Sequence, residues 1–145
     1  MIDVAPIILS CVAIAVSVLA FAEGRRRYKR DLFLKIHEMM ISADLYRGRQ
    51  LLLSQQHNET TIENLPHNER ANISRAIGAY DTLGLYLKNK NLREADVLSM
   101  WGDPAVRAWR AAQPFVTRRS KRSRRPAYPY FQYLAMRAEA AHPEP

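Results

Sequence analysis

Cysteine is nearly absent from this chain of 145 residues, which contains only Cys11. A single cysteine excludes a disulfide framework within the chain. Because structural disulfides belong to oxidising compartments, the composition fits a domain that folds in the cytosol. Cys11 lies in an apolar stretch, where we interpret it as a small apolar residue.

The sequence also lacks the recognisable motifs of nucleotide, metal and acyl-transfer chemistry. It contains neither of the glycine-rich phosphate loops, Gly-x-x-x-x-Gly-Lys-Ser/Thr and Gly-x-Gly-x-x-Gly, and no Gly-x-Ser-x-Gly nucleophile turn. The four histidines form no His-x-x-x-His pair and have no cysteine partner, so no metal site is predicted. We therefore expect a protein that is not an enzyme, with no catalytic residues and no cofactor.

Charge is absent from residues 4–22, and a basic run comes directly after them. At about 1.5 Å per residue this stretch spans roughly 28 Å, close to the hydrocarbon thickness of a bilayer. The basic residues after it are Arg25, Arg26, Arg27, Lys29 and Arg30. By the positive-inside rule we predict a single transmembrane helix over 4–22 in the plasma (inner) membrane, with residues 1–3 outside and the domain 23–141 in the cytoplasm.

A cleaved signal peptide is the competing interpretation, because Ala20-Phe21-Ala22 resembles a small-x-small cleavage site. Residues 1–5 contain no Lys or Arg, whereas signal peptides begin with a positive segment. The strongly basic residues after the site oppose translocation of the rest of the chain. We therefore expect an uncleaved anchor.

Small residues recur along the apolar stretch at intervals of three and four, which places them on one face of a helix. They are Ser10, Ala13, Ser17, Ala20 and Gly24. Spanning helices approach closely through such faces, so the stripe predicts a homo-oligomer or a membrane partner. The plain alternative is that the stripe has no binding role, because Ala and Ser are common in membrane helices.

The rest of the chain shows helical periodicity, which predicts an all-α fold. After the transmembrane helix we expect a small bundle of about four to five helices. Apolar spacing between 31 and 56 allows the spanning helix to continue as a long juxtamembrane helix, with a weak point at Gly48. The cleanest amphipathic stripe begins at His67 or Asn68. Its inward face comprises Ile73, Ala76, Ile77, Tyr80, Leu83, Gly84 and Leu87.

Capping signals divide the second half of the chain. Asn91 and Glu94 form a capping box for a short helix that Gly102 ends. Asp103-Pro104 begins another helix, which Pro114 kinks or ends. A last helix opens near residue 128, and 142–145 form a disordered tail. The inward face of this last helix comprises Phe131, Leu134, Ala135 and Ala138.

Large aromatic residues at helical spacing are usually part of a core, and we expect this here. They are Tyr46, Tyr80, Tyr86, Trp101 and Trp109.

A second basic segment precedes the last helix. Residues 104–127 contain eight bases and no acid, and the whole chain has a net charge of +8. The bases of this segment include Arg118, Arg119, Lys121, Arg122, Arg124 and Arg125. Such a segment attracts anionic lipid or nucleic acid, and the plain alternative is a solvated, partly disordered loop.

The pattern between Ile77 and Ala135 resembles a bacterial family of small proteins catalogued as a domain of unknown function. The similar positions are Asp81-Thr82-Leu83-Gly84, Leu92, Val97, Trp101, Trp109 and Tyr130-Phe131-Gln132-Tyr133-Leu134-Ala135. The resemblance implies one N-terminal spanning helix and an all-helical cytoplasmic domain, and it assigns no reaction. The chain departs from the pattern at Asp81, where we expect a glutamate, and in the length of its second basic segment.

Three functions fit these features. We favour a non-enzymatic scaffold or adaptor at the inner leaflet, whose two basic segments contact anionic lipid and whose protein partner the sequence does not identify. A membrane-tethered nucleic-acid binder is less favoured: Tyr128, Tyr130 and Phe131 would stack bases, yet no recognised nucleic-acid fold is apparent. A membrane effector of phage-defence or toxin type is the third, although no charged residue lies in the span to line a pore.

Overall fold

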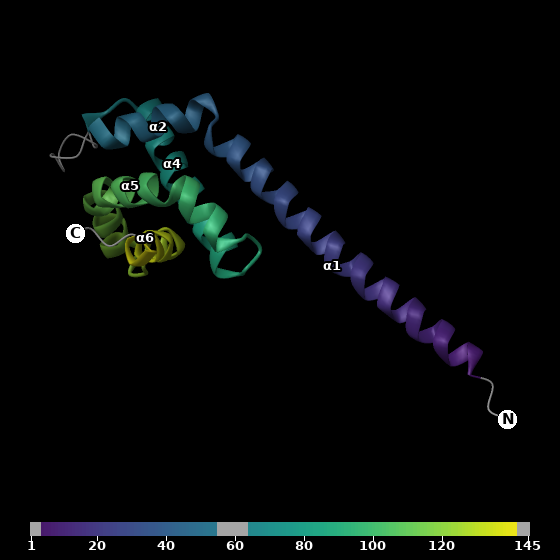
Figure 1. Cartoon of the computed structure of the whole chain (residues 1–145). Helices are drawn as coiled ribbons and strands as arrows, with labels where there is room; N and C mark the ends of the chain where they lie inside the picture. The colour runs from purple at the N-terminus through teal and green to yellow at the C-terminus, as the bar shows by residue number, and fades with distance from the viewer. Residues whose placement is uncertain (1–3, 55–63, 142–145) are drawn as a thin grey trace.

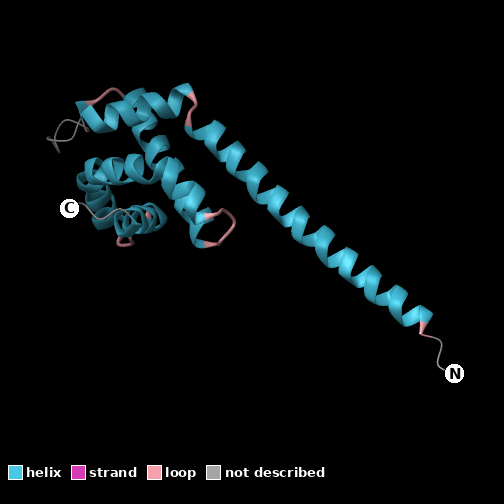
Figure 2. Cartoon of the chain, in the orientation of Figure 1, coloured by secondary structure: helices cyan, strands magenta, loops and turns pink. Residues whose placement is uncertain are grey.

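The computed structural model describes residues 4–54 and 64–141, and within these ranges all regular structure is helical (Figures 1 and 2). The helices are α1 (Ala5–Met40), α2 (Ala43–Ser54), α4 (His67–Lys88), α5 (Glu94–Ser123) and α6 (Pro129–Ala141). The all-α prediction, with a long apolar helix followed by a bundle, is confirmed. The predictions for 1–3 and for 142–145 lie outside the described residues.

α1 is one unbroken helix of 36 residues that projects as a rod from a body formed by the other helices (Figure 1). Pro6 lies in its first turn, where the missing N–H is not needed. The apolar stretch and the basic segment after it are therefore continuous, as the sequence allowed. Near the other end of the rod, Ile36 and Met40 are buried in the body.

The predicted weak point at Gly48 is wrong, because the chain breaks between Met40 and Ala43. The end of α1 is closed by Arg49, whose Nη1 donates a hydrogen bond to the carbonyl oxygen of Met40. Gly48 lies inside α2, and a Cβ there would overlap with the carbonyl group of Asn72 on α4. This glycine therefore permits close packing of α2 on α4.

α4 packs against both α2 and α6, and it lies at the centre of the body. Every residue of its predicted inward face is buried. Gly84 permits a close contact, because a Cβ there would overlap with the carbonyl group of Tyr130 on α6. The ring of Tyr80 stacks on that of Phe131 at 4.9 Å, and Trp109 of α5 meets Phe131 edge-on at 5.1 Å. Three helices thus share one aromatic centre.

α5 runs without a break from Glu94 to Ser123, so the predicted helix end at Gly102 and the predicted helix start at Asp103-Pro104 are wrong, and Pro114 does not end the helix. Gly102, Pro104 and Pro114 all lie inside it. An interior proline costs about 3 kcal/mol in a helix, but the apolar face continues across all three positions and is buried. The buried residues of this face include Val97, Leu98, Trp101, Ala105, Ala108, Ala112 and Val116. Packing of a long face therefore outweighs local stop signals.

The capping box predicted for this helix is also wrong. The N-cap residue of α5 is Arg93, and no side chain makes a capping hydrogen bond there. Glu94 instead pairs with Arg137 of α6, with 2.7 Å between Oε1 and Nε. The glutamate thus contributes to tertiary contact rather than to the local start of the helix.

α6 starts at Pro129, and its predicted inward face is buried. Its first N–H groups are satisfied from α4: Asp81 Oδ1 accepts hydrogen bonds from the backbone N–H groups of Tyr130 and Phe131, both at 2.9 Å. The carboxylate also interacts favourably with the helix dipole at this end. Asp81, which the sequence singled out only through the family resemblance, therefore fixes the start of α6.

The expectation that the aromatic residues form the core is confirmed with one exception. Tyr80 and Trp101 are buried, and Tyr86 and Trp109 pack partly buried against the core. Tyr46 is exposed on α2, where the Arg49 guanidinium lies 6.0 Å from its ring, so its predicted core position is wrong.

Candidate membrane-contact site

The first half of α1 exposes its apolar side chains on all sides. In the described part of the chain, α1 is the one helix that is long and apolar enough to cross a membrane. None of its apolar stretch is buried against the body. A signal sequence shares this length and composition. The large exposed residues include Ile7, Ile8, Leu9, Val12, Ile14, Val16, Val18, Leu19 and Phe21. Soluble monomers rarely expose so large an apolar surface, so this half suits a lipid environment.

The stripe of small residues on α1 is unobstructed. Ser10, Ala13, Ser17, Ala20 and Gly24 are all exposed. The two serine hydroxyls donate within the helix, to the carbonyl oxygens of Pro6 at 2.9 Å and of Ala13 at 2.8 Å. At about 100° per residue, the stripe lies on the side of α1 roughly opposite to the buried Ile36 and Met40. The body therefore leaves this stripe free.

The basic residues after the apolar half form a collar around α1, defined as Arg25, Arg26, Arg27, Lys29 and Arg30. Arg27 Nε lies 3.1 Å from Glu23 Oε1, and Arg30 Nε lies 3.7 Å from Asp31 Oδ1. Arg25 lies over the ring of Phe21 at 6.0 Å. These ion pairs are exposed and stabilise the fold little. Within 4–54 and 64–141, neither Arg26 nor Lys29 has a carboxylate partner.

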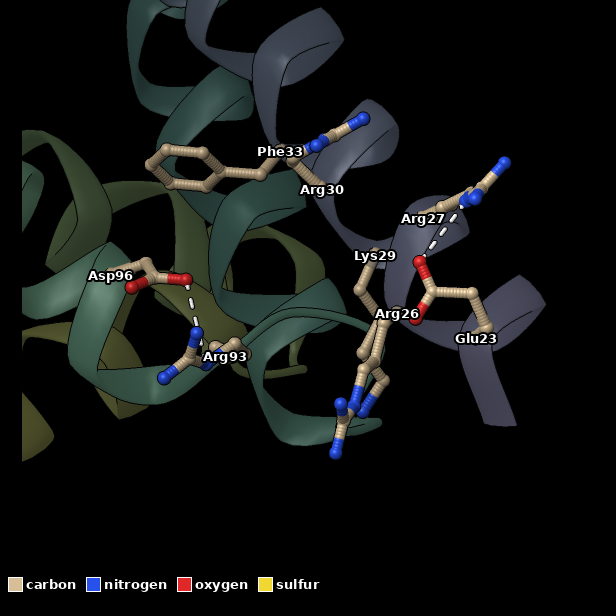
Figure 3. Close-up of a pocket in the computed structure, with 8 residues that line it drawn as sticks. All are labelled: Glu23, Arg26, Arg27, Lys29, Arg30, Phe33, Arg93 and Asp96. Atoms are coloured by element: carbon tan, nitrogen blue, oxygen red, sulfur yellow. Dashed lines mark hydrogen bonds and ion pairs between the residues drawn. The ribbon is translucent and has the colours of Figure 1, made fainter. Parts of the chain in front are cut away.

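The collar forms one wall of an open hollow of about 730 Å³, and the start of α5 forms the other wall. The lining residues are Glu23, Arg26, Arg27, Lys29, Arg30, Phe33, Arg93 and Asp96. Figure 3 shows Arg26 and Lys29 extending side by side, between the Glu23–Arg27 pair on one flank and the Arg93–Asp96 pair on the other. Bases outnumber acids among these side chains, so the hollow is positively charged.

A junction of three helices fixes the collar relative to the body. His37 of α1 lies 5.6 Å from the ring of Trp101 on α5, and the Arg49 guanidinium of α2 lies over the same ring at 5.3 Å. Arg49 also closes the end of α1. Sequence patterns gave this arginine no role, because its partners lie on other helices.

The second basic segment lies at the end of α5, on the part of the body turned away from α1 (Figure 1). Within the run from Arg118 to Arg125, residues 118–123 are helical. Arg124 ends α5 with a left-handed backbone, φ 53°. Ser120 Oγ accepts a hydrogen bond from the Ala127 N–H at 2.9 Å. The segment is therefore ordered into the α5–α6 connection, and the structure does not bring it near the collar.

Aromatic residues beside this segment are already engaged by the fold. Arg119 lies over the Tyr128 ring at 5.4 Å, and burial raises the pKa of Tyr128 despite the opposing charge of Arg119. Lys88 Nζ lies 5.4 Å from the ring of Tyr130. Phe131 is fully buried, so the prediction that it stacks nucleic-acid bases is wrong.

Within the described ranges, no group of three or more His, Cys, Asp or Glu residues is arranged to hold a metal ion.

A family model described as "Domain of unknown function (DUF4760)" matches residues 7–138. The chain belongs to the DUF4760 family. The match confirms the resemblance to a domain of unknown function, and it extends from the apolar half of α1 into α6. The apolar helix and the helical body are therefore both part of the DUF4760 pattern. No curated protein and no solved structure matches the chain.

Proposed function

We propose that this DUF4760 protein is a single-pass protein of the plasma (inner) membrane and a non-enzymatic scaffold. Residues 4–22 span the bilayer with the N-terminus outside. The helical body lies in the cytoplasm at the inner leaflet, where it presents its surface to a protein partner. The collar contacts anionic lipid directly after the span, and the second basic segment adds a weaker, diffuse attraction to the same leaflet.

The observation that carries this proposal is the contrast between the two ends of one helix. Leu9 is 73% exposed, whereas Met40 is 0% exposed in the core of the body. Cleavage after Ala22 would cut α1 in the middle of a continuous helix, so the continuity supports an anchor over a removed signal. The rod then ties the position of the body directly to the membrane.

Electrostatic attraction supports the location at the inner leaflet. Each Lys or Arg close to an anionic surface contributes about 1 kcal/mol, and the collar carries five such residues directly after the apolar half. Because the span already confines the body to the surface, little further translational entropy is lost when the basic residues touch lipid.

The unobstructed stripe of small residues supports self-association of the scaffold. Two copies paired through this stripe would carry their bodies on outward-facing sides of the helix pair, since the body packs on the opposite side of α1. Small residues let the two backbones approach closely, and packing then stabilises the pair in lipid.

The proposal is tested by extraction and by topology. Native membranes washed with alkaline carbonate should retain the full-length chain. A Cys11→Ser, Ser99→Cys variant should resist an impermeant maleimide in intact cells and react after permeabilisation, because Ser99 is exposed on the body. Release by carbonate, or labelling of intact cells, would contradict the proposal.

A further inference from the structure

The hollow beside the collar lies at the depth of lipid headgroups if residues 4–22 span the bilayer. Arg26 and Lys29 come four and seven residues after Ala22, which places them roughly 6 Å and 10 Å beyond the apolar half. The headgroup layer on each side of the hydrocarbon core is roughly 5–8 Å thick. Long basic side chains also extend along the helix toward preferred surroundings. If residues 4–22 span the bilayer, the charged ends of Arg26 and Lys29 therefore reach the depth of the lipid phosphates.

Some of the charged side chains that line the hollow form ion pairs, and others have no partner of opposite charge among the described residues. Glu23 is engaged by Arg27, and Asp96 lies 3.7 Å from Arg93. Arg26 and Lys29, between these two pairs, have no carboxylate partner in the described part of the chain. Adjacent unpaired cations repel each other, and an anion placed between them removes that repulsion.

The third base comes from a distant part of the sequence. Arg93 stands at the start of α5, and its side chain is 72% exposed. Its pair with Asp96 is exposed and weak, so the guanidinium is available to a stronger acceptor. A guanidinium binds phosphate with two parallel hydrogen bonds, which an ammonium does not provide.

We propose that the hollow binds the phosphate group of one anionic phospholipid, and that Arg26, Lys29 and Arg93 are its ligands. Phe33, which also lines the hollow, offers an apolar surface beside it. The inference rests on the proposed membrane span, and it assigns the specific contact to the collar and the α4–α5 turn rather than to the second basic segment.

The test uses full-length protein in a non-ionic detergent and native mass spectrometry to count bound lipid. Wild type should retain one phosphatidylglycerol with at least about tenfold preference over phosphatidylcholine. The Arg26→Gln/Lys29→Gln variant should bind about thirtyfold more weakly, and Arg93→Gln about fivefold more weakly, from the typical effect of one base near an anionic surface.

Matched controls separate a built site from diffuse charge. Arg124→Gln/Arg125→Gln removes two charges from the second basic segment, and Lys90→Gln removes one charge from the same turn as Arg93. Neither Lys90 nor the second segment lines the hollow. Each control should change lipid affinity by less than about twofold. Equal losses in the controls and in the hollow variants would overturn the site.

A further arm distinguishes lipid from free phosphate as the ligand. Inorganic phosphate at about 10 mM should leave the bound phosphatidylglycerol in place, because it lacks the acyl chains that lie beside α1 and add apolar burial. Displacement by inorganic phosphate would overturn the lipid assignment.

Carbonate extraction of the same variants separates the two levels of the proposal. If wild type washes from membranes, the membrane span itself fails. If all variants stay in the membrane and the hollow variants keep wild-type lipid affinity, the headgroup site alone fails. Tryptophan fluorescence should match wild type throughout, because the substituted side chains are exposed, apart from the half-buried Lys29, and none of them lies in the hydrophobic core.

Discussion

The two basic segments are similar in composition and differ in surroundings. The collar lies directly after an exposed apolar half-helix, and its charges face a hollow that a second element completes. The second segment lies at the far end of α5, where Ser120 and Arg119 tie it to Ala127 and Tyr128 in the turn before α6. The comparison teaches that charge count does not fix the role of a basic run. The distance of a basic run from the apolar half of α1, and the contacts that the run already makes, are also needed to judge its role.

The largest expected effect comes from disturbing the close packing of α4 on α6, the helix that follows the second segment. Gly84→Ala places a Cβ against the Tyr130 carbonyl group, and α4 and α6 must move apart. We expect a loss of about 3 kcal/mol in unfolding free energy, the upper range for overpacked sites. Thermal unfolding of the full chain in detergent, followed by fluorescence of Trp101 and Trp109, measures it.

The matched control is Gly78→Ala on the same helix, where a Cβ meets nothing within 4 Å. Helix propensity predicts a gain of up to about 1 kcal/mol there. Membrane insertion of both variants should equal wild type, because the collar and the apolar half lie on α1. Equal destabilisation by the two changes would contradict the close contact at Gly84.

A second prediction concerns the aromatic centre shared by α4, α5 and α6 at high pH. Burial raises the pKa of Tyr80 to about 12, against the opposing charges of Arg49 and Arg107. The unfolded phenol titrates near pH 10, so the folded state loses stability as the pH rises from about 10 to 12. The loss should approach about 2 kcal/mol and disappear in Tyr80→Phe, measured by chemical unfolding at each pH.

At pH 7 the same Tyr80→Phe change should alter stability by less than about 1 kcal/mol. The Tyr80 hydroxyl is buried without a hydrogen-bond partner in the described part of the chain, so its removal breaks no bond. Tyr46→Phe, at an exposed position, is the control and should keep the alkaline loss of wild type. Persistence of that loss in Tyr80→Phe would show that another group causes it.

A smaller effect is expected from the cap that starts α6. Asp81→Ala leaves the N–H groups of Tyr130 and Phe131 without their acceptor and should cost about 1 kcal/mol, with Asp81→Asn between this variant and wild type. Thr82→Ala, which removes only an exposed bond to the Gly78 carbonyl oxygen, is the neighbouring control. If both positions tolerate alanine equally, Asp81 does not fix α6.

The spacing of apolar residues alone was sufficient to predict the buried faces of α4 and α6. The inward faces of α4 and α6 are buried as their spacing predicted, because amphipathic stripes report burial directly. The predicted helix end at Gly102 and the predicted helix start at Asp103-Pro104 failed, and Pro114 does not end the helix, since the gain from packing a long α5 against α6 exceeds the cost of each interruption.

The candidate site was predictable only in part. The collar could be predicted from charge and from the apolar stretch before it. The hollow could not, because Arg93 reaches it through tertiary packing from a turn far along the sequence. Asp81 was missed as a cap for the same reason: its partners lie 49 and 50 positions away.

Labelling of Cys11 shows whether the exposed apolar half of α1 lies in lipid, as we propose. Cys11 is the only cysteine of the chain and is exposed on this half of the helix. In native membranes it should resist a water-soluble maleimide and react only after denaturation in detergent, whereas Ser42→Cys in a Cys11→Ser background should react at once in opened vesicles. Rapid labelling of Cys11 in intact native membranes would contradict the account.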